Sequence, residues 1–243
     1  MSQSANRSSS NGRLSVGVVG AGPVGAVLGQ ALAAAGHMVI GIAATEPKNI
    51  ERAETLLPDV AVVSVPQIIE QADLVLLAIP AEEIEKTVSG IAEAGLFRAG
   101  QLLAHTAGEF GFGILEPAVS KGVIPLAIHP AMTFTGTSID LARIRESYFA
   151  VAAPNVALPI AQALVIEMGA EPIVISEQDR KTYFEAISVA NNFSKLIVNQ
   201  SIGLLESLGI ENPRSVLAPV IRSAVEEALA EGHVPIDPEE LLN

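Results

Sequence analysis

A glycine-rich turn between a strand-like run and a helix-like run is the feature that most constrains the fold of this chain. The apolar residues 14–19 lead into Gly20-Ala21-Gly22-Pro23-Val24-Gly25, and an alanine-rich segment follows as far as Gly36. A G-x-G-x-x-G pattern in this context predicts the phosphate-binding turn of a dinucleotide-binding βαβ unit. The first glycine would allow the tight turn, the second the approach of a pyrophosphate, and the third close packing of helix on strand. An ordinary glycine-rich turn without a ligand is the alternative.

Composition and charge exclude several classes of function. The chain has 243 residues, no cysteine and a formal net charge of −13. Nucleic acid would be repelled, and disulfides, thiolate zinc sites and cysteine nucleophiles are excluded; we expect no metal site. Residues 1–13 are polar and predict a disordered tail, not a secretory signal, so we expect a cytoplasmic protein. The apolar residues 26–44 are interrupted by Gln30, Gly36 and His37 and predict a helix and a strand, not a membrane span.

Strand-like runs alternate with helical patterns over the first three quarters of the chain. Near-continuous valine, isoleucine and leucine in the runs predict a mostly parallel sheet that is buried on both faces. We therefore expect an α/β fold, a doubly wound Rossmann sheet over residues 14–176. The strand-like runs cover residues 15–19, 38–43, 60–64, 74–79, 101–105, 123–129, 148–152 and 172–175.

The remaining residues, 177–243, predict an all-α domain. No turn signal interrupts residues 177–208 before Gly209, so one long helix is expected there. A second helix is predicted from Pro213 to Ala230, with a kink at Pro219, and a third begins at Asp237. A long helix with a continuous apolar face needs cover, and we expect a homodimer through these C-terminal helices.

Candidate ligand-binding residues follow the predicted strands, because ligands of open α/β sheets bind at the carboxyl ends of the strands. His105 and His129 end two different strands and are expected at the same edge, although a structural histidine is the alternative for each. His37 is interpreted as structural. The other candidates are Thr45, Ile79 and Pro80 for the cofactor, together with residues 20–25, and Thr106 and Gly108 for the substrate.

The choice between NAD and NADP is ambiguous in the segment after the second strand. Glu46 has nearly the spacing of the acidic residue that binds the ribose 2′-hydroxyl of NAD. Thr45, Lys48 and Arg52 are suited instead to a pocket for the 2′-phosphate of NADP. We favour NADP, with NAD as the alternative.

The predicted long helix carries the last group of candidates. Asn192, Lys195 and Asn199 are spaced at i, i+3 and i+7 and so share one face. The alternative is that they belong to the ordinary polar face of an amphipathic helix.

The chain resembles the superfamily of β-hydroxyacid dehydrogenases, 6-phosphogluconate dehydrogenases and ketopantoate reductases, and most of all its Rossmann-like proteins with a C-terminal domain of unknown function. The resemblance covers residues 14 to about 230 and implies a Rossmann domain joined to a helical domain. Three departures are Ala107 in place of a usual serine and Phe184 and Phe193 in place of histidines. The motifs that carry the resemblance are residues 20–25, 72–80, 105–108 and 126–136.

The resemblance implies an NAD(P)-dependent oxidoreductase acting on a small carbonyl, hydroxy-acid or imine compound. Lys195 with Asn199 is similar to the lysine–asparagine pair that acts on the substrate in the dehydrogenases, and His129-Pro130 resembles the substrate-contacting histidine of prephenate dehydrogenases. We therefore expect Lys195, Asn199 and His129 to be catalytic and Asn192, Thr106 and Gly108 to contact the substrate. The departures favour the alternative of a dinucleotide-binding protein without turnover.

Overall fold

The computed structural model describes residues 12–232. The chain divides into two compact units, Met1–Glu185 and Ala186–Asn243, and each is described by itself. The tail expected over residues 1–13, apart from residues 12 and 13, and the helix expected from Asp237 lie outside the described residues.

Within the described residues, seven strands form one sheet in the order β2-β1-β3-β4-β5-β6-β7. Neighbouring strands run parallel except β5 and β6, which are antiparallel. The predicted doubly wound, mostly parallel α/β fold is confirmed. The strands are β1 (Ser15–Val19), β2 (Met38–Ala43), β3 (Leu74–Leu77), β4 (Leu102–His105), β5 (Ile124–Pro130), β6 (Tyr148–Ala152) and β7 (Glu171–Val174).

The strand expected over residues 60–64 is wrong, because this segment makes a single bridge, between Ile42 and Val62. The segment cannot continue along β2, because Ser64 already caps the next helix, α3 (Val65–Gln71), through a capping box with Gln67. Pro66 in the first turn also has no N–H group for a strand ladder.

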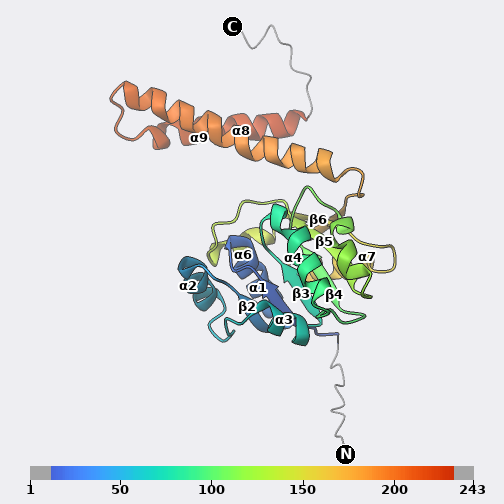
Figure 1. Ribbon diagram of the computed structural model, residues 1–243. Coiled ribbons are helices and arrows are strands. Elements are labelled where there is room, and N and C mark those ends of the chain that lie inside the picture. Colours follow the sequence, from blue (N-terminus) through green and yellow to red (C-terminus); the bar gives the residue numbers. More distant parts are fainter. Residues whose placement is uncertain (1–11, 233–243) are drawn as a thin grey trace, which may run out of the picture. The chain divides into compact units, whose positions relative to one another are not determined.

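Helices cover both faces of the sheet, which explains why its strands are apolar on both sides (Figure 1). One core lies under α1 (Pro23–Ala34), α2 (Pro47–Leu56), α6 (Ile139–Ile144) and α7 (Leu158–Glu167). The other lies under α3, α4 (Ala81–Glu93) and α5 (Glu116–Val119), which follows the 3-10 turn η1 (Phe112–Leu115). This sandwich of helices and sheet leaves the carboxyl edge of the strands to the connecting loops.

The first turn of α1 lies unusually close to β1 and β3. A Cβ atom at Gly25 would clash with the carbonyl oxygen of Gly20 and lie 2.9 Å from the Ala78 methyl group. Gly20 has a φ of +101°, and a Cβ there would clash with the Ala78 carbonyl oxygen. The predicted roles of these two glycines, a tight turn and close helix packing, therefore match the backbone that the structure shows.

The C-terminal part is helical, as predicted. The expected long helix is α8 (Arg180–Ser207), and α9 (Pro213–Glu231) begins at the expected proline and contains Pro219. In the second unit, α8 and α9 run side by side (Figure 1) and line a hollow of about 500 Å³ that includes Val198, Ile202 and Leu217. No helix of the described chain is long and apolar enough to span a membrane.

Candidate functional site

The glycine-rich loop ends in the open N-terminus of α1. Gly22 is the N-cap residue, no side chain caps the helix, and Pro23 supplies no N–H group. Within the described residues the N–H groups of Gly22, Val24 and Gly25 have no hydrogen-bond acceptor. A Cβ at Gly22 would meet no atom within 4 Å. The loop thus presents free donors and the positive end of the helix dipole to open space, as an anion requires.

The predicted cofactor residues lie at the carboxyl ends of three neighbouring strands. Gly20 follows β1, and its N–H group donates to the carbonyl oxygen of Ala43, the last residue of β2, at 3.0 Å. Thr45 is exposed two residues farther on. Ile79 and Pro80 follow β3, and Ile79 lies 3.2 Å from the Cβ position of Gly20. The structure brings these predicted residues to one edge.

His129 lies near the end of β5, beside the segment that follows β4. Its Nδ1 atom is 2.8 Å from the Tyr183 hydroxyl group, and its ring stacks edge-on against Tyr183 and Phe184. A Cβ at Gly108 would clash with Phe184 and lie 2.8 Å from Nε2 of His129. Two predicted residues, His129 and Gly108, are therefore in close contact, and only glycine leaves room for this histidine.

Burial lowers the pKa of His129 to about 4, with a smaller effect from the charge of Arg180. The imidazole is consequently neutral near pH 7. A neutral ring can accept or donate one hydrogen bond without bringing a charge to the site.

His105 is buried at the end of β4 and has a structural contact. Its Nε2 atom donates to the Gly111 carbonyl oxygen at 2.8 Å, which leaves Nδ1 as a buried lone pair without a partner in the described chain. Burial lowers its pKa to about 4. The prediction that His105 and His129 share one edge agrees with the register, in which His105 pairs with Ala127, two residues before His129.

Arg180, which the sequence did not single out, is the most unusual residue of this region. Its guanidinium is buried at the start of α8, and Nη2 donates to the carbonyl oxygens of Ala127 at 3.4 Å and Ala150 at 3.3 Å. Nε and Nη1 have no partner, and no carboxylate forms an ion pair with this residue within the described chain. Burial lowers its pKa. A buried cation beside both histidines helps keep them uncharged.

Glu177 ties the start of α8 to the loop after β4. Its carboxylate accepts hydrogen bonds from the N–H groups of Phe112 and Gly113, at the N-terminus of η1. A Cβ at Gly111 would clash with the same carboxylate. Because Gly111 also binds His105, one connected set of hydrogen bonds fixes the loop that carries Thr106 and Gly108. Thr106 itself donates its N–H group to the Leu77 carbonyl oxygen at 3.2 Å.

The remaining predicted residues belong to the second unit. Asn192, Lys195 and Asn199 are all exposed on α8, and Asn199 also borders the hollow between α8 and α9. Their shared face agrees with the helical spacing. Their catalytic and substrate-binding roles remain predictions.

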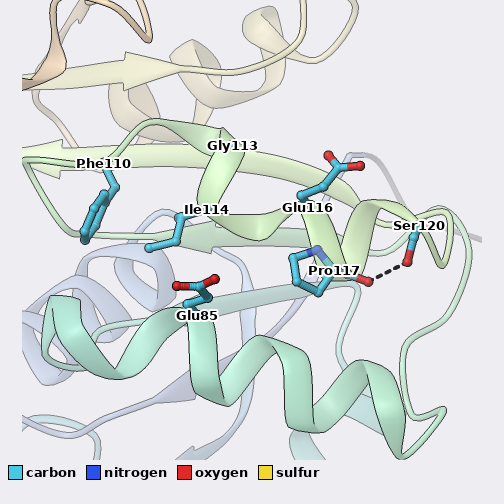
Figure 2. Close-up of a pocket in the computed structure, with 7 residues that line it drawn as sticks. All are labelled: Glu85, Phe110, Gly113, Ile114, Glu116, Pro117 and Ser120. Carbon is cyan, nitrogen blue, oxygen red and sulfur yellow. Dashed lines mark hydrogen bonds between the residues drawn. The ribbon is translucent and has the colours of Figure 1, made fainter.

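A further hollow of about 580 Å³ lies between α4 and the η1–α5 turn (Figure 2). Glu85 points into it from α4, and Phe110, Ile114 and Pro117 form much of the opposite wall. The lining includes Glu85 and Glu116 and no basic residue. It is therefore unsuited to the phosphates of a dinucleotide.

Two family models match the sequence. Residues 1–130 match the Rossmann-like domain, and residues 147–236 match a domain of unknown function, DUF2520. No curated protein matches the sequence.

Solved structures with similar folds include oxidoreductases. A Bacteroides fragilis protein provisionally named an NADP oxidoreductase has a TM-score of 0.73 and 18% identity, covering 88% of this chain and 80% of its own. Pyrroline carboxylate reductase of Plasmodium falciparum with NADP bound has a TM-score of 0.67 and 16% identity. The match covers 91% of this chain and 80% of the reductase. Prephenate dehydrogenase of A. aeolicus with hydroxyphenyl propionate and NAD+ has a TM-score of 0.63 and 18% identity. The match covers 80% of this chain and 71% of the dehydrogenase. At these identities the similarity shows the fold.

The two buried histidines predict a loss of stability in acid. Both have a folded-state pKa of about 4, below the 6.5 of an exposed histidine, so between these pH values the unfolded chain binds more protons. Stability therefore rises with pH in this window. Each histidine should lower the free energy of unfolding by about 2 kcal/mol from pH 7 to pH 5, measured by urea unfolding. His129→Gln should remove about half of their combined effect; an unchanged pH dependence would contradict this assignment.

Proposed function

The chain belongs to the Rossmann-like domain family, and on that basis we propose that it is an oxidoreductase that binds NADP(H) at the glycine-rich loop. The observation that carries the proposal is the open N-terminus of α1, where Gly22, Val24 and Gly25 offer free N–H groups to an unobstructed space. A pyrophosphate fits these donors and the helix dipole. The oxidoreductase names of proteins with the same fold support the proposal.

Residues at the ends of the first three strands would hold the cofactor. The loop Gly20–Gly25 would bind the pyrophosphate, while Thr45, Ile79 and Pro80 would border the rest of the molecule. When bound, the cofactor supplies the hydride that passes to or from the substrate. We favour NADP because Lys48 follows Thr45 closely in the sequence and because two of the named structural neighbours are NADP proteins; NAD is the alternative.

The substrate would be a small compound with a C=O or C=N group, or the corresponding hydroxy acid. In the first unit, His129, Thr106 and Gly108 would border it, with His129 forming an uncharged hydrogen bond. On α8, Lys195 would give a proton to the oxygen or nitrogen atom that becomes reduced, and Asn192 and Asn199 would orient the substrate.

A dinucleotide-binding protein without turnover is the second candidate function. The observation that favours it is that Lys195 is exposed within its unit, like a residue on an ordinary solvated helix face. Phe184, whose ring lies against that of His129, also takes the place of a histidine that the family resemblance implies. Both candidates require dinucleotide binding and differ in the consequence of removing Lys195.

Gly22→Val should abolish dinucleotide binding while the fold survives. The new side chain meets no protein atom at its Cβ, but it occupies the space that a pyrophosphate must enter. Titration of the wild type and the variant with NADPH and NADH, read by thermal shift, checks this prediction. A deazaflavin is titrated as well, as an alternative redox partner to the nicotinamide. Saturation at 100 times Kd should stabilise the wild type by about 2.7 kcal/mol. If the variant binds NADPH and NADH as well as the wild type, the loop is not the cofactor site.

Lys195→Met tests the proton donor. The substitution keeps much of the apolar stem and removes the acid, so turnover should fall by about 10² to 10⁴ while NADPH affinity is unchanged. Asn199→Ala should raise KM and lower kcat together, because it would misplace the substrate. Lys181→Met, another exposed lysine on the same helix, is the control and should leave the rate unchanged. Full activity of Lys195→Met would remove the catalytic assignment.

We also propose a homodimer through the C-terminal helices. Large apolar side chains on α8 and α9 are exposed, among them Phe193, Leu196, Ile197, Val220 and Leu229. Covering them with a second copy would remove this apolar surface from water. Light scattering at micromolar concentration should give twice the chain mass of 25.2 kDa. A stable particle of the single chain mass would contradict the dimer.

A further inference from the structure

Arg52 connects α2 to the glycine-rich loop. Its Nη1 atom donates to the carbonyl oxygen of Ala21 at 3.2 Å and to Oδ1 of Asn49 at 2.6 Å. Ala21 is buried and lies between Gly20, which makes the tight turn, and Gly22, which would approach the pyrophosphate. A side chain from a separate helix therefore holds a backbone carbonyl in the middle of the loop.

This contact sets the direction of the next N–H group. The Ala21 carbonyl and the Gly22 N–H belong to one peptide group, and no peptide bond of the described chain is cis. In a planar trans peptide the C=O and N–H bonds point in opposite directions. When Arg52 holds the carbonyl, the Gly22 N–H consequently points away from Arg52, and this N–H is among the free donors of the loop.

The loop between β5 and α6 supports the position of Arg52 from behind. Gly136 has a φ of +75°, and a Cβ there would lie 2.6 Å from Nε of Arg52 and 3.2 Å from Cα of Pro23. The buried carboxylate of Asp140 accepts the N–H groups of Thr135 and Gly136, each at 2.8 Å. The half-buried Arg52 side chain thereby lies against a hydrogen-bonded loop, close to the start of α1.

We propose that Arg52 is a positioning residue, which orients the Gly22 N–H toward the cofactor pyrophosphate through the Ala21 carbonyl. The inference rests on the proposed dinucleotide binding at this loop. It differs from the sequence-based alternative, in which Arg52 binds the 2′-phosphate of NADP directly. Arg52, Lys48 and Ser138 line a hollow of about 390 Å³, and this hollow supports the alternative of a 2′-phosphate site.

The two roles predict different specificity in binding. Both cofactors contain the pyrophosphate, so Arg52→Met should lower the affinity for NADPH and for NADH by the same factor. This factor is roughly 10-fold, as expected for losing one charged hydrogen bond. If Arg52 instead bound the 2′-phosphate, Arg52→Met would weaken the binding of NADPH and leave the binding of NADH unchanged. Arg52→Lys should recover part of the affinity for both, because an ammonium group can donate to the same carbonyl.

Lys48→Met is the matched control. Lys48 lies one turn earlier on α2, is exposed, and pairs with Glu46 at 3.7 Å; within the described chain no hydrogen bond joins its side chain to residues 20–25. Lys48→Met removes the same positive charge as Arg52→Met, but its effect on the affinity for NADH should be small. If Arg52→Met and Lys48→Met weaken NADH equally, only the net charge matters and the positioning role is wrong.

A measurement without cofactor separates loop order from ligand contacts. The N–H groups of Gly20 and Ala26 are hydrogen-bonded at the two ends of the loop, to Ala43 and Gly22. Their hydrogen exchange should be faster in Arg52→Met than in wild type or Lys48→Met. Should Arg52→Met fail to fold, Asn49→Ala removes the acceptor that holds Nη1 and should weaken both cofactors equally, to a smaller extent.

The outcomes distinguish the inference from the function on which it rests. If the wild type binds neither NADPH nor NADH, the proposed function fails, and the inference with it. If the wild type binds and Arg52→Met leaves both affinities and the exchange rates unchanged, the inference alone is overturned. A loss confined to NADPH overturns it in favour of a 2′-phosphate ligand.

Discussion

The close approach of α1 to the sheet is the constraint on which the proposed cofactor site depends. Helix and strand can meet this closely only because Gly25 has no Cβ to clash with the Gly20 carbonyl oxygen, and because Gly20 adopts a positive φ. The approach brings the free N–H groups of the first helical turn to the carboxyl edge of β1. Without it, the positive end of the helix would lie away from the residues that follow β2 and β3.

A second constraint acts at the antiparallel end of the sheet. Because β6 runs against β5, the carbonyl groups of Ala127 and Ala150 are both within reach of one guanidinium, that of Arg180. The cation is buried and forms no ion pair with a carboxylate within the described chain, which is energetically costly and so requires a well-ordered surrounding. Glu177 provides part of that order by holding the loop after β4. The first turn of α8 thus belongs to the sheet edge as much as to the helix.

Much of the first unit is predictable from the sequence, because its features are local. The glycine pattern, the apolar runs and the histidines at the ends of β4 and β5 each follow from neighbouring residues. The strand prediction for residues 60–64 is wrong because valine-rich segments are typical of strands, whereas here the capping box of α3 ends the extended segment. Arg52 and Arg180 act through contacts with residues 31 and 53 positions away, respectively. No spacing rule reveals such partners: the sequence indicates Arg52 only as a candidate for the 2′-phosphate pocket and does not single out Arg180.

The net charge of −13 shows why local geometry, not overall composition, decides whether this edge can bind an anion. At physiological ionic strength, exposed charges farther away than about 8 Å are largely screened. Most carboxylates on the surface therefore exert little influence on the loop at Gly22. The groups that do act are the free N–H donors of α1, with Arg52 directly behind them. An acidic protein can in this way hold a strongly anionic dinucleotide, provided that its donors are oriented before the ligand arrives.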